Sequence, residues 1–322
     1  MSEPVKVSCH PTEDGHQIGV LTLDSPASLN ALSLPMIQIL QQTLTRWEQD
    51  SAIVCVLLQG AGEKAFCAGG DIRSFYYRKQ EASEAELFGY ARDFFEQEYR
   101  LDALIANYPK PVTARLHGIS MGGGLGLALH ASRVVVEVDL VLAMPETTIG
   151  LFPDVGVDFE VSRMPRQTGA WLVMTGESVD AFSAQWAGLV HEALGVADSG
   201  PTQLELDAEW IEPCFSGDDA AAVLAALESH PDERARNCAA LIRTKSPLSV
   251  CVALEALRRA ESMATVDEVL AQDLVLARNF VADSDFVEGV RAQLVDKDRT
   301  PQWRHARIED VPRELVGSMF EA

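Results

Sequence analysis

The sequence predicts an α/β fold for its first 205 residues or so, followed by an all-helical region. The first part is indicated by a strand–helix–strand beginning over residues 16–58 and by glycine-rich turns between later strand-like and helix-like runs. Beyond those turns only helix-period patterns recur. We therefore expect a core domain over residues 1–205 and a helical C-terminal region over residues 206–322, acting as a lid or in oligomerisation.

The N-terminal elements follow from local patterns. Residues 16–23 alternate loosely between polar and apolar side chains, as a strand does. Ser33 is a good N-cap and Pro35 suits a first helical turn, which predicts a helix over residues 34–49. Apolar residues recur along it at helical spacing: Met36, Ile37, Leu40, Leu44 and Trp47. The run IVCVLL at 53–58 predicts a short buried strand.

A second set of signals precedes the centre of the chain. Residues 60–71, GAGEKAFCAGGD, form a glycine-containing turn that Asp71 closes as a helix cap. A capping box at Ser83 and Glu86 begins a helix that ends before the Pro-Lys-Pro stretch at 109–111.

The stretch from His117 to Gly156 organises the chain. A strand over residues 111–116 leads into three glycines at 122–124, a small apolar helix, and a β-branched strand over 133–144. Glycines at such a turn leave backbone N–H groups free to meet a ligand. Two acids follow at loop positions: Glu146 and Asp154. Backbone donors beside carboxylates indicate an acyl-transfer or enolate site.

The remaining segments are mostly helical. Glycines close two helices, over 167–175 and 178–187, and a short strand follows at 189–193. The composition of residues 195–202 is that of a linker. Five further helices are predicted, over residues 218–228, 232–243, 247–261, 266–282 and 286–295.

Composition excludes several classes of protein. The net charge of −22 makes nucleic acid a poor partner, because a phosphate backbone requires a basic surface. No apolar run approaches the roughly 20 residues of a membrane span, and the polar N-terminus lacks a signal-peptide core, so we expect a cytoplasmic protein without a membrane partner. The six cysteines form no CxxC pair, which predicts free thiols and no structural zinc.

Two alternatives compete for the glycine-rich centre. Gly118-Ile-Ser120-Met-Gly122 matches the G-x-S-x-G pattern of a serine hydrolase, with several histidines downstream as partners: His130, His191, His230 and His305. Chance matches to this short pattern are common, and no HGGG-type loop precedes it. Dinucleotide binding is disfavoured because the glycines do not satisfy G-x-G-x-x-G.

Three motifs in order resemble the enoyl-CoA hydratase/isomerase (crotonase) superfamily: KAFCAGGD (64–71), HGISMGGG (117–124) and MPET (144–147). Three further segments resemble its branch that hydrolyses 3-hydroxyisobutyryl-CoA: FFEQEYRL (94–101), AMPETTIGLFPDVG (143–156) and EGVRAQLVDKDRTPQW (288–303). The resemblance covers nearly the whole chain. It implies a crotonase-type spiral of strand–helix turns and a homo-oligomer, a trimer or a hexamer.

The resemblance also implies roles for particular residues. The superfamily's oxyanion hole, two backbone N–H groups, falls on Gly70 and Gly123, with Ala68 and Asp71 as neighbouring substrate contacts. The glutamate that a hydratase carries after the three glycines is replaced here by Gly126.

The hydrolase branch instead pairs a glutamate with an aspartate eight residues later, here Glu146 and Asp154, and has a substrate-contacting glutamate, here Glu98. These acids favour hydrolysis of a short 3-hydroxyacyl-CoA, with 3-hydroxyisobutyryl-CoA in valine breakdown as the leading substrate, over the alternative of an enoyl-CoA hydratase or isomerase. No metal is implied, because the backbone donors polarise the carbonyl, and no separate cofactor is implied, because coenzyme A is part of the substrate. The chain departs from the branch at Val157-Asp-Phe-Glu160, which leaves the acyl group open. Four cations are candidates for the CoA phosphates: Lys64, Arg73, Arg78 and Lys297.

Overall fold

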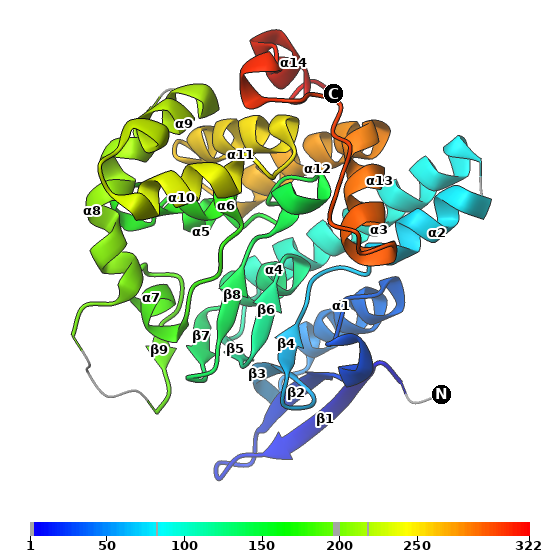
Figure 1. Cartoon of the computed structure of the whole chain (residues 1–322). Helices are drawn as coiled ribbons and strands as arrows, with labels where there is room; N and C mark the ends of the chain where they lie inside the picture. The colour runs from blue at the N-terminus through cyan, green and yellow to red at the C-terminus, as the bar shows by residue number, and fades with distance from the viewer. Residues whose placement is uncertain (1–2, 82, 196–199, 218) are drawn as a thin grey trace.

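The chain winds as a spiral in which successive turns supply one strand to each of two sheets (Figure 1). The computed structural model describes residues 3–81, 83–195, 200–217 and 219–322. The larger sheet has the order β1-β2-β3-β5-β7-β9 and the smaller one β4-β6-β8. Each pairing is parallel apart from the antiparallel pair β1 and β2. The predicted α/β spiral is confirmed.

The larger sheet contains β1 (Val5–Pro11), β2 (Gln17–Leu23), β3 (Ile53–Gly60), β5 (Val112–Leu116), β7 (Arg133–Val136) and β9 (Glu192–Ala193). The smaller sheet contains β4 (Ala65–Cys67), β6 (Ile119–Met121) and β8 (Val141–Ala143). Strand β1 was not predicted although its residues alternate between apolar and polar, and in this edge strand only the first residue is buried. The three-residue strand β4 lies within the stretch predicted as a turn, and β6 was not predicted, since so few residues carry no periodic signal.

One predicted strand, over residues 133–144, is wrong as a single element. It forms β7 and β8, which belong to different sheets and are separated by a turn in which the N–H of Leu140 donates to the carbonyl of Glu137. β-Branched residues run through the whole of residues 133–144, so the sequence does not show where one strand ends. The two strands are distinguished only by the different strands with which they pair.

The helices that frame the site include α1 (Leu34–Gln49), α2 (Arg73–Glu81), α3 (Glu84–Ala106) and α4 (Gly123–Leu129), with the 3-10 turn η2 (Glu146–Ile149) and the short helix α5 (Asp158–Val161). Helix α1 has the predicted bounds, and its apolar stripe is fully buried, each such side chain contributing about 1.5–3 kcal/mol. The capping box of Ser83 and Glu86 begins α3 as predicted.

The later helices are α6 (Thr168–Thr175), α7 (Ala181–Trp186), α8 (Gln203–Phe215), α9 (Ala220–Ser229), α10 (Glu233–Ile242), α11 (Pro247–Ala260), α12 (Val266–Ala282), α13 (Ser284–Val290) and α14 (Arg313–Ser318), with a π-helix, η4, over Arg291–Val295 and a 3-10 turn, η5, over Ile308–Asp310. Helix α8 was not predicted. Residue 205 lies in its first turn, and residues 196–199 of the predicted linker lie outside the described residues. The division into a core and a C-terminal region stays a prediction.

The C-terminal helices pack on the core rather than apart from it. Helix α6 contacts α8, α10 and α11, and α12 packs along α3, which carries residues of the site (Figure 1). Buried apolar side chains from both parts form one continuous hydrophobic core. No helix among the described residues combines the length and the apolar character needed to cross a bilayer.

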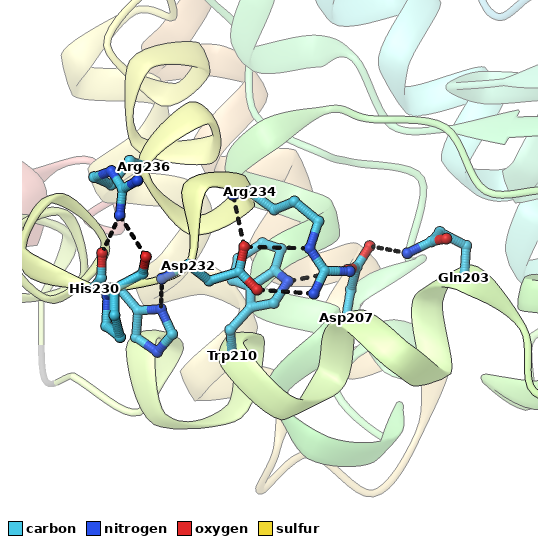
Figure 2. A network of polar contacts seen from close by, with 8 residues as sticks. Gln203, Asp207, Trp210, His230, Asp232, Arg234 and Arg236 are labelled. Carbon is cyan, nitrogen blue, oxygen red and sulfur yellow. Dashed lines mark hydrogen bonds and ion pairs between the residues drawn. The ribbon is translucent and has the colours of Figure 1, made fainter.

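Polar contacts join α8 to α10 at the outer surface (Figure 2). Asp207 of α8 accepts hydrogen bonds from Trp210, at 3.0 Å, and from Gln203, at 3.1 Å, and pairs with Arg234 of α10. Arg234 also pairs with Asp232 at 2.8 Å. Half-exposed ion pairs of this kind each contribute at most about 1 kcal/mol, so the buried apolar faces hold these helices.

Candidate active site

A cavity of about 280 Å³ lies where the two glycine turns of the spiral meet. Its wall includes the turn after β4, the turn before α4, one face of α3, and the loop that follows β8. A larger hollow of about 640 Å³ between α3 and α12 has no acidic residue in its described lining. The volume of a cavity therefore does not identify the candidate active site. The polar groups that line the smaller cavity do.

The first polar group is the backbone N–H of Gly70. Leu32 forms an isolated parallel bridge here, donating its N–H to the carbonyl of Gly69 and accepting the N–H of Asp71. This pairing turns the N–H of Gly70 to the opposite side, toward the cavity that Gly70 lines. Among the described residues, no acceptor binds it.

The second polar group is the N–H of Gly123, the first residue of α4. Such an N–H has no partner within its helix, and none is supplied by another described residue. A Cβ built on Gly123 would lie 3.3 Å from the nitrogen of Gly70, so the two free donors are close together. The positive end of the α4 dipole favours negative charge at this point.

The glycines also make room for two carboxylates. A Cβ on Gly122 would lie 2.8 Å from Oε1 of Glu146, and one on Gly123 would lie 2.3 Å from Oε1 of Glu98. The positive φ of Gly122, 51°, further disfavours other residues there. Small residues in the three-glycine motif therefore let two acids approach the backbone donors.

Three buried acids line the cavity: Glu98, Glu146 and Asp154. Burial, and then the charge of Asp154, raises the pKa values of Glu98 and Glu146 well above the ordinary range. Burial raises the pKa of Asp154 to about 6, against the opposing effect of a hydrogen bond from Tyr99. Asp154 is therefore the acid of this group that ionises most readily near neutral pH.

Most of the predicted site residues lie together. Gly70, Gly123, Glu98, Glu146, Asp154 and Ala68 all line the cavity. Asp71 does not: its N–H is held by Leu32 and its carboxylate binds no described residue. The four candidate cations for CoA phosphates, Lys64, Arg73, Arg78 and Lys297, are exposed and lie outside the cavity wall. The roles predicted for these residues stay predictions.

The serine-hydrolase alternative finds no support in the geometry. Ser120 lies within strand β6 rather than at a strand-to-helix elbow, and its buried hydroxyl has no hydrogen-bond partner among the described residues. It does not line the cavity. The ring of His130 is directed to the carbonyl of Val155 instead.

Several residues around the site were missed by sequence reasoning. Tyr99 donates to Asp154, and three further buried aspartates lie behind the cavity wall: Asp102, Asp158 and Asp273. The spacing of Glu98 and Asp102, four residues apart on an apolar helix face, was a usable signal. Gln293 and Leu294, from the π-helix, complete the cavity wall; they lie in the segment 288–303 that carries part of the family resemblance, but no site role was predicted for them.

The fold and the site define an α/β spiral enzyme with paired backbone donors and buried carboxylates in one cavity. A family model described as enoyl-CoA hydratase/isomerase matches residues 18–200 and 190–320. The chain therefore belongs to the enoyl-CoA hydratase/isomerase, or crotonase, family, as the sequence motifs indicated, and this is a family of enzymes.

The similar proteins carry three different names. The mitochondrial 3-hydroxyisobutyryl-CoA hydrolase of Homo sapiens is 33% identical, over 94% of this chain and 86% of that protein. The protein of the same name from Xenopus tropicalis is 32% identical, over 98% and 91%. A solved carnitinyl-CoA dehydratase from Mycobacterium thermoresistibile superposes with a TM-score of 0.90, 33% identity, and coverage of 100% and 97%. An enoyl-CoA hydratase from Rhodobacter sphaeroides also gives 0.90, with 32% identity and coverage of 99% and 97%.

Proposed function

We propose that the protein hydrolyses the thioester of a short 3-hydroxyacyl-CoA, with 3-hydroxyisobutyryl-CoA as the leading substrate. The observation that carries the proposal is the pair of unpartnered N–H groups, on Gly70 and Gly123, facing the same cavity as Glu146 and Asp154. The names of the relatives in Homo sapiens and Xenopus tropicalis support the choice of substrate.

In the proposed mechanism the thioester oxygen lies between the N–H groups of Gly70 and Gly123, which stabilise the negative charge that develops on it. Each such donor contributes on the order of 10²–10³ in rate. In its ionised form, the Glu146 carboxylate either attacks the carbonyl carbon, giving a mixed anhydride and CoA thiolate, after which water cleaves the anhydride and frees Glu146, or it removes a proton from the attacking water. In the second route that proton passes to the departing sulfur.

The other two acids take complementary roles. Asp154, ionised near neutral pH, accepts a hydrogen bond from the substrate hydroxyl or from water. Glu98, whose pKa is raised by burial and then by the charge of Asp154, donates a hydrogen bond from its protonated form to the acyl end. Two carboxyl groups whose environments separate their pKa values can in this way act as acceptor and donor in one cavity.

No step uses a metal. Location in the cytoplasm and assembly into a trimer or hexamer are further proposals.

The test is release of thiol from 3-hydroxyisobutyryl-CoA by the wild type beside Glu146→Gln, with a no-substrate blank for the protein's own cysteines. We expect fast release that falls at least 10³-fold in Glu146→Gln. Glu255→Gln, which changes an exposed ion-pair acid on α11, should match the wild type. Hydroxylamine added during turnover separates the two routes, because it captures an anhydride on Glu146.

The second candidate is an enoyl-CoA hydratase or isomerase, which the names of the solved relatives favour. The structure gives a specific reason for ranking it lower. A side chain at position 126, where a hydratase carries its first glutamate, has no room: a Cβ there would lie 2.6 Å from Cβ of Val155 and 2.9 Å from both Asp102 oxygens. No thiol release, together with loss of the conjugated double bond of crotonyl-CoA, would establish this alternative instead.

A further inference from the structure

Asp154 stands at the start of a tight turn whose backbone is unusual. The N–H of Val157 donates to the carbonyl of Asp154 at 3.3 Å, and the two residues between them both have positive φ, 57° for Val155 and 75° for Gly156. Glycine adopts such a conformation freely, but a β-branched valine does so only under strain. A strained residue persists where its surroundings hold it in place, and such residues cluster at functional sites.

Three side chains hold this turn, one at each of three consecutive residues. Tyr99 of α3 donates to Oδ2 of Asp154 at 2.7 Å. His130, which caps α4, contacts the carbonyl of Val155 through Nε2 at 2.8 Å, and since a carbonyl only accepts, Nε2 carries the hydrogen. Asp273 of α12 accepts the N–H of Gly156 through Oδ2 at 2.8 Å.

All of these groups are buried. Val155 and Asp273 are fully inaccessible, and Tyr99, His130 and Asp154 are nearly so. A buried hydrogen bond to the backbone cannot be replaced by water, so losing one partner leaves the other unsatisfied. The acceptor from α12 is not a local contact: it comes from the region after residue 205, more than a hundred residues beyond the turn.

We propose that Asp273 and His130 are positioning residues that hold the strained Asp154–Val157 turn, and so orient the Asp154 carboxylate in the cavity. Neither residue lines the cavity in which the substrate is proposed to bind, and both act through the backbone of the turn. The C-terminal helices therefore contribute to the chemistry by fixing a loop of the core. The kinetic part of this inference rests on the proposed thioesterase activity.

The decisive comparison is Asp273→Ala with Asp273→Asn. The asparagine oxygen can still accept the Gly156 N–H, whereas alanine cannot. We expect Asp273→Ala to lower kcat on the order of 10²-fold, as misplacement of a catalytic group by about 1 Å does, with little change in KM. Asp273→Asn should retain most of the wild-type kcat. His130→Phe and His130→Gln form an independent pair, because glutamine keeps a donor for Val155 and phenylalanine does not.

A control for lost stability is Leu224→Ala, which removes buried apolar contact in α9 and leaves the turn intact. If it lowers the melting temperature as Asp273→Ala does and leaves kcat unchanged, destabilisation does not explain the loss. Tyr99→Phe combined with Asp273→Ala should lose less than the product of the two single losses, because both hold one carboxylate. If the two losses in kcat multiply, Tyr99 and Asp273 do not act on the same carboxylate. If kcat is equal in Asp273→Ala and the wild type, Asp273 is not a positioning residue.

Hydrogen exchange at the Gly156 amide reports, without any substrate, whether the hydrogen bond that holds the turn is formed. Protection should be lost in Asp273→Ala and kept in Asp273→Asn, and unchanged protection in Asp273→Ala would refute the inference even if thiol release is fast. If the wild type releases no thiol, the proposed function fails while exchange still decides whether the turn is held. Should Asp273→Ala not fold, the two His130 variants provide the same comparison.

Discussion

The phenol of Tyr99 and the carboxylate of Asp154 form a buried hydrogen bond of 2.7 Å between residues 55 positions apart. Tyr99 follows Glu98 on α3, so one helix supplies both an acid of the cavity and the donor that supports another acid. This hydrogen bond lowers the pKa of Asp154, against the larger effect of burial, which raises it.

Tyr99→Phe should shift the pH dependence of thiol release. Without the phenol hydrogen, the pKa of Asp154 rises further above its value of about 6. An acid ionises as pH rises through its pKa, and the ionised form is the one we propose to act, so the ascending limb of the kcat profile should move to higher pH. Kinetics from pH 5 to 9 test this. If the ascending limb of the kcat profile stays at the same pH while kcat falls by the same factor at every pH, Tyr99 does not act through the ionisation of Asp154.

Asp154→Asn should stabilise the fold at alkaline pH although it impairs activity. Burial raises the pKa of Asp154 from 3.8 to about 6, so the folded state binds the proton more tightly than the unfolded state. The contribution of this proton to the free energy of unfolding is complete below about pH 4 and is lost as pH rises through about 6. The loss amounts to about 3 kcal/mol. Melting at pH 8 should therefore occur at higher temperature in Asp154→Asn, with little difference at pH 4.

The matched control for this prediction is Asp310→Asn, the same change at an exposed aspartate. It should leave the melting temperature unaltered at both pH values. A lower melting temperature for Asp154→Asn at pH 8 would mean that the ionised carboxylate makes net favourable contacts in the fold.

Gly126→Ala should impair both stability and turnover. The added Cβ would lie 2.6 Å from Cβ of Val155, within the turn that begins at Asp154, and 2.9 Å from both oxygens of Asp102. Overpacking of this kind costs about 1–3 kcal/mol, and displacement of the turn should lower kcat. Gly89→Ala is the control, because its Cβ would meet nothing within 4 Å and alanine gains up to about 1 kcal/mol in a helix. Normal kcat in Gly126→Ala would show that the turn tolerates the shift.

Arg291→Ala should loosen the segment that closes the cavity. The guanidinium binds Glu288 at 2.8 Å, Asp296 at 2.9 Å and Asp298 at 2.7 Å, and so fixes the π-helix that presents Gln293 and Leu294. We expect KM to rise several-fold, since each pair contributes at most about 1 kcal/mol at this exposure. Arg313→Ala, which removes an exposed arginine with one ion pair, is the control. Unchanged KM together with unchanged proteolytic resistance of residues 291–302 would contradict the prediction.

The sequence predicted the elements whose signals are local. Helix α1 came from its N-cap and its apolar stripe, α3 from its capping box, and the cavity's glycines from two motifs. The motifs also placed Glu98, Glu146 and Asp154 in one site, as the structure does. The short strand β9 lies within the predicted strand over residues 189–193. The three-residue strands β4 and β6 and the division of residues 133–144 into two strands could not be predicted, because their evidence lies in pairing with distant segments.

By itself, the sequence determined the family, the spiral of strand–helix turns, and the acids and glycines of the cavity, because each depends on residue types at short spacing. Only the tertiary structure decided what surrounds them. Asp273 reaches Gly156 across 117 positions, Tyr99 reaches Asp154 across 55, and the π-helix near the C-terminus closes the cavity. The physical reason is that desolvation and buried hydrogen bonds, which set the charge and orientation of a carboxylate, depend on neighbours in space rather than along the chain.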